Sequence, residues 1–109
     1  MAAERVLCPY LAAAVEISAE RAEHIAERHP ELLPEHMAAL ASALADPDTV
    51  RRSRRMPTAR LFCRWCPGVH GGKHVVVVVV SERGPSRHWV VTAYLSSREA
   101  AGETEWQRT

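Results

Sequence analysis

Two cysteines and two histidines in one short stretch have the residue types of a zinc site. The segment CRWCPGVHGGKH, residues 63–74, places Cys63 and Cys66 three residues apart, and His70 and His74 follow at intervals of four. Zinc in proteins binds four such ligands in tetrahedral geometry. The stretch could therefore form a small structural metal site, or alternatively the end of a plain β-hairpin that contains cysteine.

Strand geometry favours the hairpin over the zinc site. Cys63 lies in a run of strand character, residues 59–65, and successive side chains of a strand point to opposite faces. Cys63 and Cys66 would then face apart unless the strand ends by Arg64. The connection GVHGG is typical of a hairpin, and paired zinc ligands are usually separated by more residues than this. We therefore expect no metal and no other cofactor, with a zinc-binding domain as the alternative.

A second group of chemically competent residues lies in EHIAERHPELLPEH, residues 23–36. Histidine exchanges protons near neutral pH, which suits general acid or base catalysis. His24 and Arg28 are four residues apart, so on a helix they share a face and place a base beside a phosphate-binding cation. His29 lies on the apolar stripe of the same helix and should point towards the sheet. The structural alternative for His29 is a helix-end histidine that interacts with the helix dipole.

Arginines gather in the segment that follows. Residues 1–48 carry nine acidic and three basic residues, a balance of −6, whereas residues 49–109 carry four acidic and eleven basic residues, a balance of +7. Guanidinium groups pair with phosphate oxygens through two parallel hydrogen bonds, so this half of the chain favours RNA as a partner. A solvated basic surface is the alternative. Six arginines and no acidic residue lie between residues 49 and 66: Arg51, Arg52, Arg54, Arg55, Arg60 and Arg64.

Helical and extended patterns predict the elements that must position these residues. Ser18 is a typical N-cap for a helix that ends before Pro30, and a second helix has Pro34 in its first turn. Residues 5–17 are ambiguous between helix and strand. The sequence predicts an α+β domain, with N-terminal helices packed on a roughly four-stranded antiparallel meander sheet. The expected strands are residues 49–55, 59–65, 73–82 and 88–95.

Length and composition predict one soluble domain. The 109 residues suffice for a single core, expected at about residues 15–96, with a polar tail at 97–109. The longest pure apolar run, residues 75–80, is much shorter than the roughly 18 residues of a membrane span, so no membrane contact is expected. Three cysteines without a recognisable signal peptide favour the cytoplasm. The oligomeric state cannot be deduced from these features.

Several motifs together resemble a known nuclease group. The chain contains the segments HIAERHPE, ADPDTVRRS and VVTAYL, with a basic strand and a valine-rich strand between the last two. This arrangement is similar to that of the barnase, EndoU, colicin and RelE-like (BECR fold) nucleases. The likeness is greatest to the short phage- and mobile-element-associated members and spans roughly residues 15–96. It implies a metal-independent ribonuclease, often a toxin, with helices packed on a four-stranded antiparallel sheet. RNA and a cognate inhibitor protein would be its partners.

The resemblance also implies catalytic roles for residues of the helix and the last strand. His24 or His29 would be the general acid or base, and Thr92 would supply a hydroxyl group, with Tyr94 beside it. Strand alternation places Thr92 and Tyr94 on the same face as Val90. Attack by the 2′-hydroxyl of RNA needs a base, an acid and cations, and it leaves a 2′,3′-cyclic phosphate. The alternative for Thr92 and Tyr94 is an ordinary β-forming role.

The phosphate contacts would come from arginines. Arg60 and Arg64 alternate onto one face of their strand, and the resemblance places them on the scissile phosphate. The rival function is a non-catalytic module that binds RNA through the arginines or a protein through the acidic half. Catalytic activity itself and the RNA substrate are left open. The expected phosphate-binding residues are Arg28, Arg54, Arg60 and Arg64.

Overall fold

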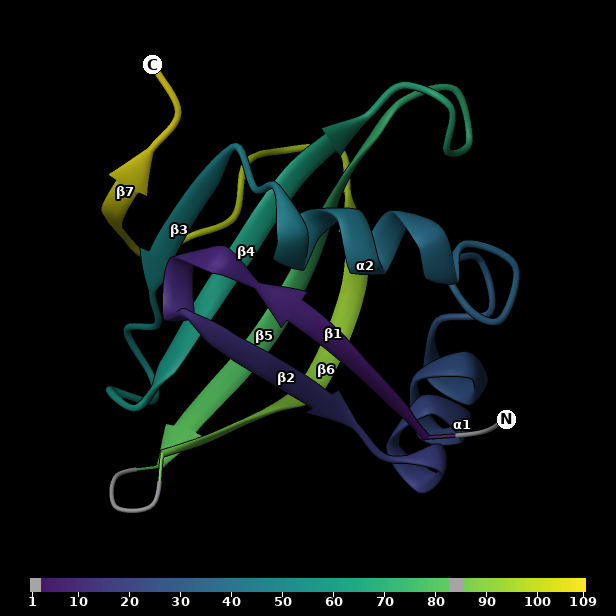
Figure 1. Ribbon diagram of the computed structural model, residues 1–109. Helices are drawn as coiled ribbons and strands as arrows, with labels where there is room; N and C mark the ends of the chain where they lie inside the picture. The colour runs from purple at the N-terminus through teal and green to yellow at the C-terminus, as the bar shows by residue number, and fades with distance from the viewer. Residues whose placement is uncertain (1–2, 83–85) are drawn as a thin grey trace.

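The computed structural model describes residues 3–82 and 86–109, and within them the chain forms one curled seven-stranded sheet with two short helices (Figure 1). The helices are α1 (Ala19–Arg28) and α2 (Met37–Ala45), and a 3-10 turn, η1, spans Pro9–Leu11. The strands are β1 (Glu4–Cys8), β2 (Ala13–Ile17), β3 (Thr49–Arg52), β4 (Ala59–Cys66), β5 (Lys73–Glu82), β6 (Arg87–Ser96) and β7 (Glu103–Gln107).

The sheet is mixed. Its strand order is β1-β2-β6-β5-β4-β3-β7, and neighbouring strands run antiparallel with the exception of β2 and β6. These two strands are parallel and meet at a single residue pair, Glu16 and Trp89. Because that contact is so short, the β1–β2 hairpin diverges from β6 and folds across the sheet (Figure 1).

The expected four-stranded antiparallel meander with N-terminal helices packed on it is wrong. The four predicted strands are present as β3 to β6, but the described residues add three more strands. Residues 4–17 form a hairpin in which Val6 is paired with Val15, and Ala12, with φ 53°, lies in the turn between the strands. The polar tail supplies β7, which pairs with β3. The sheet therefore extends beyond residues 15–96 at both ends.

The two helices agree more closely with the sequence pattern. The Ser18 hydroxyl caps α1 by accepting a hydrogen bond of 3.0 Å from the backbone N–H of Arg21, which confirms the predicted N-cap. The helix ends before Pro30, as expected. Pro34 precedes α2 and is not in its first turn, because this helix begins only at Met37. None of the helices in the described residues is both long enough and apolar enough to span a membrane.

The main core lies between one face of the sheet, α2 and the β1–β2 hairpin (Figure 1). We call this the core face, and it carries Phe62, Val75, Val77 and Ala93. The ring of Tyr10, at the end of the hairpin, lies edge-on to Phe62 at 5.9 Å and is 6.1 Å from the ring of Trp106 in β7. The curl of the sheet thus brings the hairpin to the opposite edge strand.

The opposite side of the sheet, which we call the open face, is less completely covered. It carries Leu61, Cys63, Val76 and Tyr94. Residues 97–102 cross it, and Ala100 packs against Cys63 and Val76. Because α2 and the hairpin fill the core face, the open face is where side chains of the central strands can meet a ligand.

Candidate functional site

Strand register brings Thr92 and Tyr94 onto the open face together with a basic residue of β3. One row of directly paired residues runs across β3, β4, β5 and β6, and it consists of Arg51, Leu61, Val78 and Thr92. The next row consists of Thr49, Cys63, Val76 and Tyr94. Rows of this kind place a hydroxyl group and a guanidinium group on one surface, separated by apolar side chains.

A groove of about 560 Å³ lies on the open face beside Thr92. We call it the open-face groove. Leu61 and Val78 provide apolar lining, Thr92 and Tyr94 line it from β6, and the loop after β3 contributes Arg54 and Arg55. In the part of the chain that the structure describes, neither Arg54 nor Arg55 forms an ion pair. Their charges are therefore available to an anion that enters the groove.

His29 lies next to this groove without lining it. The residue is the C-cap of α1, and its ring centroid is 6.2 Å from that of Tyr94. Its Nδ1 is 3.3 Å from Oε1 of Glu31. This contact brings a carboxylate close to the ring without forming a hydrogen bond. The groove thus has an imidazole beside one of its lining residues.

Tyr94 is suited to donating a proton rather than accepting one. Burial of the side chain, with a smaller contribution from Cys63, raises the pKa of Tyr94 above its ordinary value of 10.0. The phenol therefore keeps its proton at neutral pH. An alkoxide leaving group is far more basic than phenolate, so a phenol can protonate it.

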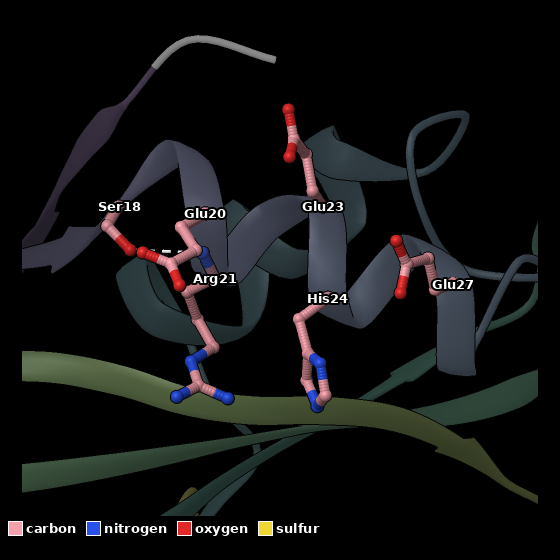
Figure 2. A pocket seen from close by; sticks show the side chains of 6 residues that line it. All are labelled: Ser18, Glu20, Arg21, Glu23, His24 and Glu27. Atoms are coloured by element: carbon pink, nitrogen blue, oxygen red, sulfur yellow. Dashed lines mark hydrogen bonds between the residues drawn. The ribbon is translucent and has the colours of Figure 1, made fainter.

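His24 is placed elsewhere. It is exposed on α1 and lines a hollow of about 410 Å³ together with Arg21 and three carboxylates, those of Glu20, Glu23 and Glu27. Figure 2 shows Arg21 and His24 extending on the same side of the helix. A hollow with three carboxylates and one guanidinium repels phosphate. Arg28 is exposed in the last turn of the same helix and does not line the open-face groove.

Arg60 and Arg64 share a face of β4, as alternation predicts, but it is the core face. They alternate with Leu61 and Cys63, which lie on the open face, so they point away from Thr92. Nε of Arg60 donates to Oε2 of Glu105 at 2.8 Å. The structure therefore does not bring these two arginines together with the hydroxyl groups of β6.

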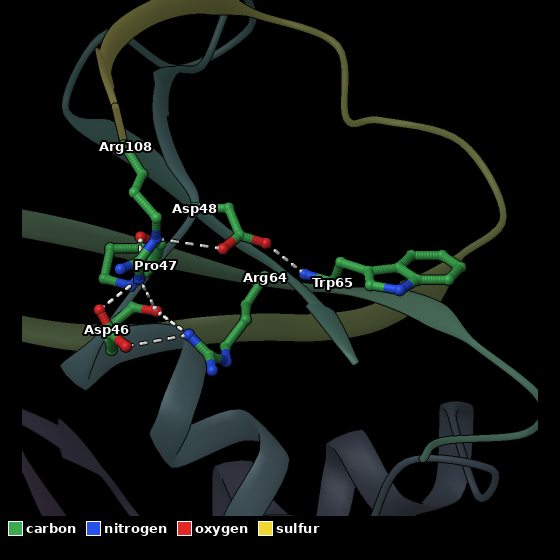
Figure 3. A network of polar contacts seen from close by, with 6 residues as sticks. All are labelled: Asp46, Pro47, Asp48, Arg64, Trp65 and Arg108. Atoms are coloured by element: carbon green, nitrogen blue, oxygen red, sulfur yellow. Dashed lines mark hydrogen bonds and ion pairs between the residues drawn. The ribbon is translucent and has the colours of Figure 1, made fainter. Parts of the chain in front are cut away.

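Arg64 is part of a polar network at the end of α2 (Figure 3). Its Nη1 donates to the backbone oxygen of Asp46 at 2.6 Å and to Oδ2 of the same residue at 3.1 Å. Arg108 also donates to Asp46, and this hydrogen bond is the main cause that lowers the pKa of the carboxyl group. The backbone N–H of Trp65 donates to Asp48 at 2.7 Å. The network joins the C-terminal residues to α2 and β4.

The ion pair between Arg60 and Glu105 should contribute to the stability of the fold in a pH-dependent way. Burial alone would raise the pKa of Glu105, but hydrogen bonds from Arg60 and Arg52 outweigh it and hold the pKa below its ordinary value of 4.5. Because the pKa of Glu105 is lower in the folded state than in the unfolded state, the ionised carboxylate stabilises the fold at pH values above 4.5. This stabilisation is lost as the pH falls through the folded-state pKa. We expect Glu105→Gln to lower the free energy of unfolding by about 1 kcal/mol at neutral pH, because the pair is partly solvated.

Urea unfolding at neutral pH and at about pH 3 measures this effect. The difference between wild type and Glu105→Gln should shrink as the pH falls below 4.5, because the unfolded state then takes up a proton that the paired carboxylate of the folded state resists. Glu103→Gln, an exposed change on the same strand, is the matched control and should leave the midpoint nearly unchanged. Equal loss in both variants would show that Arg60 is not held by Glu105.

The cysteines and histidines of residues 63–74 do not converge. Cys63 packs on the open face, whereas Cys66 packs against the main core on the other side. Nε2 of His70 is 2.8 Å from the backbone oxygen of Glu31, and the ring of His74 lies 4.9 Å from that of Trp65. Among the described residues, no group of three or more histidine, cysteine or acidic side chains is placed to hold a metal ion. The segment forms the β4–β5 hairpin.

Several groove residues were missed because they depend on register. Arg55 belongs to the arginine-rich segment, but its position beside Thr92 follows from the turn after β3. In this turn the Ser53 hydroxyl accepts hydrogen bonds from the backbone N–H groups of Arg55 and Met56, each at 3.2 Å. A bulge at Val78 and Val79 shifts the pairing with β6, so Val90 packs in the main core and does not share a face with Thr92. The bulge had no sequence signal.

Comparisons of this chain with protein-family models, with curated proteins and with solved structures gave no match.

Proposed function

We propose that this chain is a metal-independent ribonuclease that cleaves RNA in the open-face groove. The observation that supports it best is that one surface gathers the groups the reaction needs. His29 lies beside Tyr94, and Tyr94 shares the groove with Thr92 and Arg54. These four are residues for which the nuclease resemblance or the arginine cluster suggested a role. His24, Arg28, Arg60 and Arg64 are placed elsewhere and have no part in the proposed site.

The reaction follows from the placement of these groups. The 2′-oxygen of the RNA attacks the adjacent phosphorus while the imidazole of His29 takes the 2′-hydroxyl proton. The bond between phosphorus and the 5′-oxygen breaks, and the Tyr94 phenol protonates that oxygen. The products are a 2′,3′-cyclic phosphate and a free 5′-hydroxyl group. Arg54 and Arg55 offset the charge that develops on the phosphorane, and the Thr92 hydroxyl donates to one of its oxygens.

Charge supports RNA as the ligand of this groove. The guanidinium groups of Arg54 and Arg55 have no ion-pair partner among the described residues, whereas that of Arg60 does. Bidentate pairing with phosphate is the strongest interaction of a guanidinium group with an anion. The apolar lining formed by Leu61 and Val78 suits the faces of unstacked bases. A groove of this composition favours single-stranded RNA over a duplex.

The test is a cleavage assay in the presence of EDTA. Purified protein is incubated with an end-labelled single-stranded RNA, with the DNA of the same sequence, and with the fully 2′-O-methylated RNA. We expect cleavage of the unmodified RNA alone, with 2′,3′-cyclic phosphate ends, because the 2′-hydroxyl is the nucleophile. Intact RNA that is retained in a salt-sensitive manner would instead identify a binding module. Cleavage that EDTA abolishes would also overturn the proposal.

A further inference from the structure

A second hollow lies on the open face, on the other side of residues 99–102. It has a volume of about 200 Å³, and Arg51, Trp65, His74 and Asp48 line it. The Asp48 carboxylate is already engaged, since it accepts from the Trp65 backbone N–H and pairs with Arg108. Glu99 and Ala100 border this hollow, whereas Ala101 and Gly102 border the open-face groove. The crossing segment thus separates two parts of one surface. Trp65 lies four residues along β4 from Leu61, or about 14 Å at the usual strand rise, so one RNA strand can reach both hollows.

Arg51 in this hollow has an incompletely satisfied guanidinium group. Its side chain is 14% exposed, and its Nε is buried without a hydrogen-bond partner among the described residues. Its Nη2 contacts Oε2 of Glu99 at 3.3 Å, and the Glu99 side chain is 74% exposed. An exposed carboxylate at this distance is a weak partner. A phosphate group would replace it with more acceptor oxygens for the terminal guanidinium nitrogens.

Trp65 and His74 provide an aromatic surface next to this cation. The two residues are directly paired between β4 and β5, and their rings lie 4.9 Å apart in an edge-to-face arrangement with an interplanar angle of 64°. The indole is 44% exposed, and it rests on Gly72, where an added Cβ would lie 2.6 Å from the ring. Support from the backbone fixes the ring while part of it faces solvent. Fixed, exposed aromatic rings beside a cation are the usual platform for unpaired bases.

We propose that this hollow is a nucleotide-binding subsite for single-stranded RNA. An unpaired base stacks on the indole of Trp65, with the His74 ring at its edge, and the adjoining phosphate binds Arg51 in place of Glu99. This inference rests on the proposed function, because the same RNA strand continues into the open-face groove. It adds the requirement that the substrate also be unpaired at a nucleotide a short distance along the strand from the cleaved bond.

The test measures binding without cleavage. Affinity for the fully 2′-O-methylated single-stranded RNA is followed by fluorescence anisotropy. Trp65→Ala should weaken binding by about 5- to 100-fold, and Trp65→Phe should restore most of it, because stacking needs only an aromatic ring. Trp106→Ala is the matched control, since Trp106 is also exposed but lies on β7. Circular dichroism checks that each variant is folded.

A gain of affinity provides an independent readout. Glu99→Gln removes the carboxylate that competes for Arg51 and should tighten binding by about 2- to 5-fold, without changing a buried residue. If Trp65→Ala and Glu99→Gln both bind like wild type while Arg54→Ala weakens binding, the subsite is wrong and the open-face groove stands. If the wild-type protein binds no single-stranded RNA, the proposed function and the subsite both fail.

Discussion

Replacing His29 with alanine is expected to lower the rate of RNA cleavage by about 100- to 10,000-fold, the usual contribution of a general acid or base. The physical reason is that the His29 ring lies beside Tyr94, which lines the open-face groove. Without the imidazole, water must take the 2′-hydroxyl proton. Single-turnover cleavage of a labelled RNA measures the rate of this step directly.

His24→Ala is the control for this experiment. His24 lies on the same helix, five residues earlier, but it is exposed among carboxylates and does not line the open-face groove. We expect its cleavage rate to stay within about twofold of wild type, and both variants should bind uncleavable RNA as wild type does. A large loss in His24→Ala with normal cleavage in His29→Ala would contradict the assignment.

Phe62→Ala is expected to lower the free energy of unfolding by about 3–5 kcal/mol, the largest effect on stability that we predict. Phe62 is fully buried at the centre of the core face, directly between Val50 and Val77 in the register, and Tyr10 packs edge-on against it. Truncation leaves a cavity beneath the hairpin and removes the edge-on contact with Tyr10. Urea denaturation measures the loss.

Phe62→Leu separates the loss of volume from the loss of an aromatic contact. A leucine keeps most of the apolar volume, so this variant should lose less than about 1.5 kcal/mol. If alanine at this position cost under about 1 kcal/mol, the hairpin would not be packed on Phe62 as described.

The sequence predicted the local elements better than their assembly. Ser18 and Pro30 bounded α1 because capping and proline geometry act within a few residues. β7 was missed because all five of its residues are exposed and carry no apolar pattern. This edge strand is held by backbone pairing with β3 and by contacts of Glu105 and Trp106 with residues distant in sequence. The parallel contact between Glu16 and Trp89 joins residues distant in sequence and has no local signal either.

The candidate site was predicted in part for the same reason. Thr92 and Tyr94 were rightly placed on one face, because they are two residues apart in a strand. Arg60 and Arg64 seemed to be free cations because no acidic residue lies near them in sequence. Their partners, Glu105 and Asp46, come from 45 and 18 residues away. The pairing of charges across the fold, which sequence spacing does not show, separates structural arginines from those available to a ligand.

The segment that crosses the open face has a consequence for how such a protein could diverge. The positions of the strand residues on the open face are fixed by the fold, because the residues next to them in the same strands form the main core. Residues 97–102 are constrained mainly at Ala100, which is buried, and at Gly102, whose φ of 121° and close approach to the backbone oxygen of Arg52 exclude a side chain. The remaining positions can change at little cost in stability. New substrate preferences could therefore evolve in this short stretch while the sheet stays unchanged.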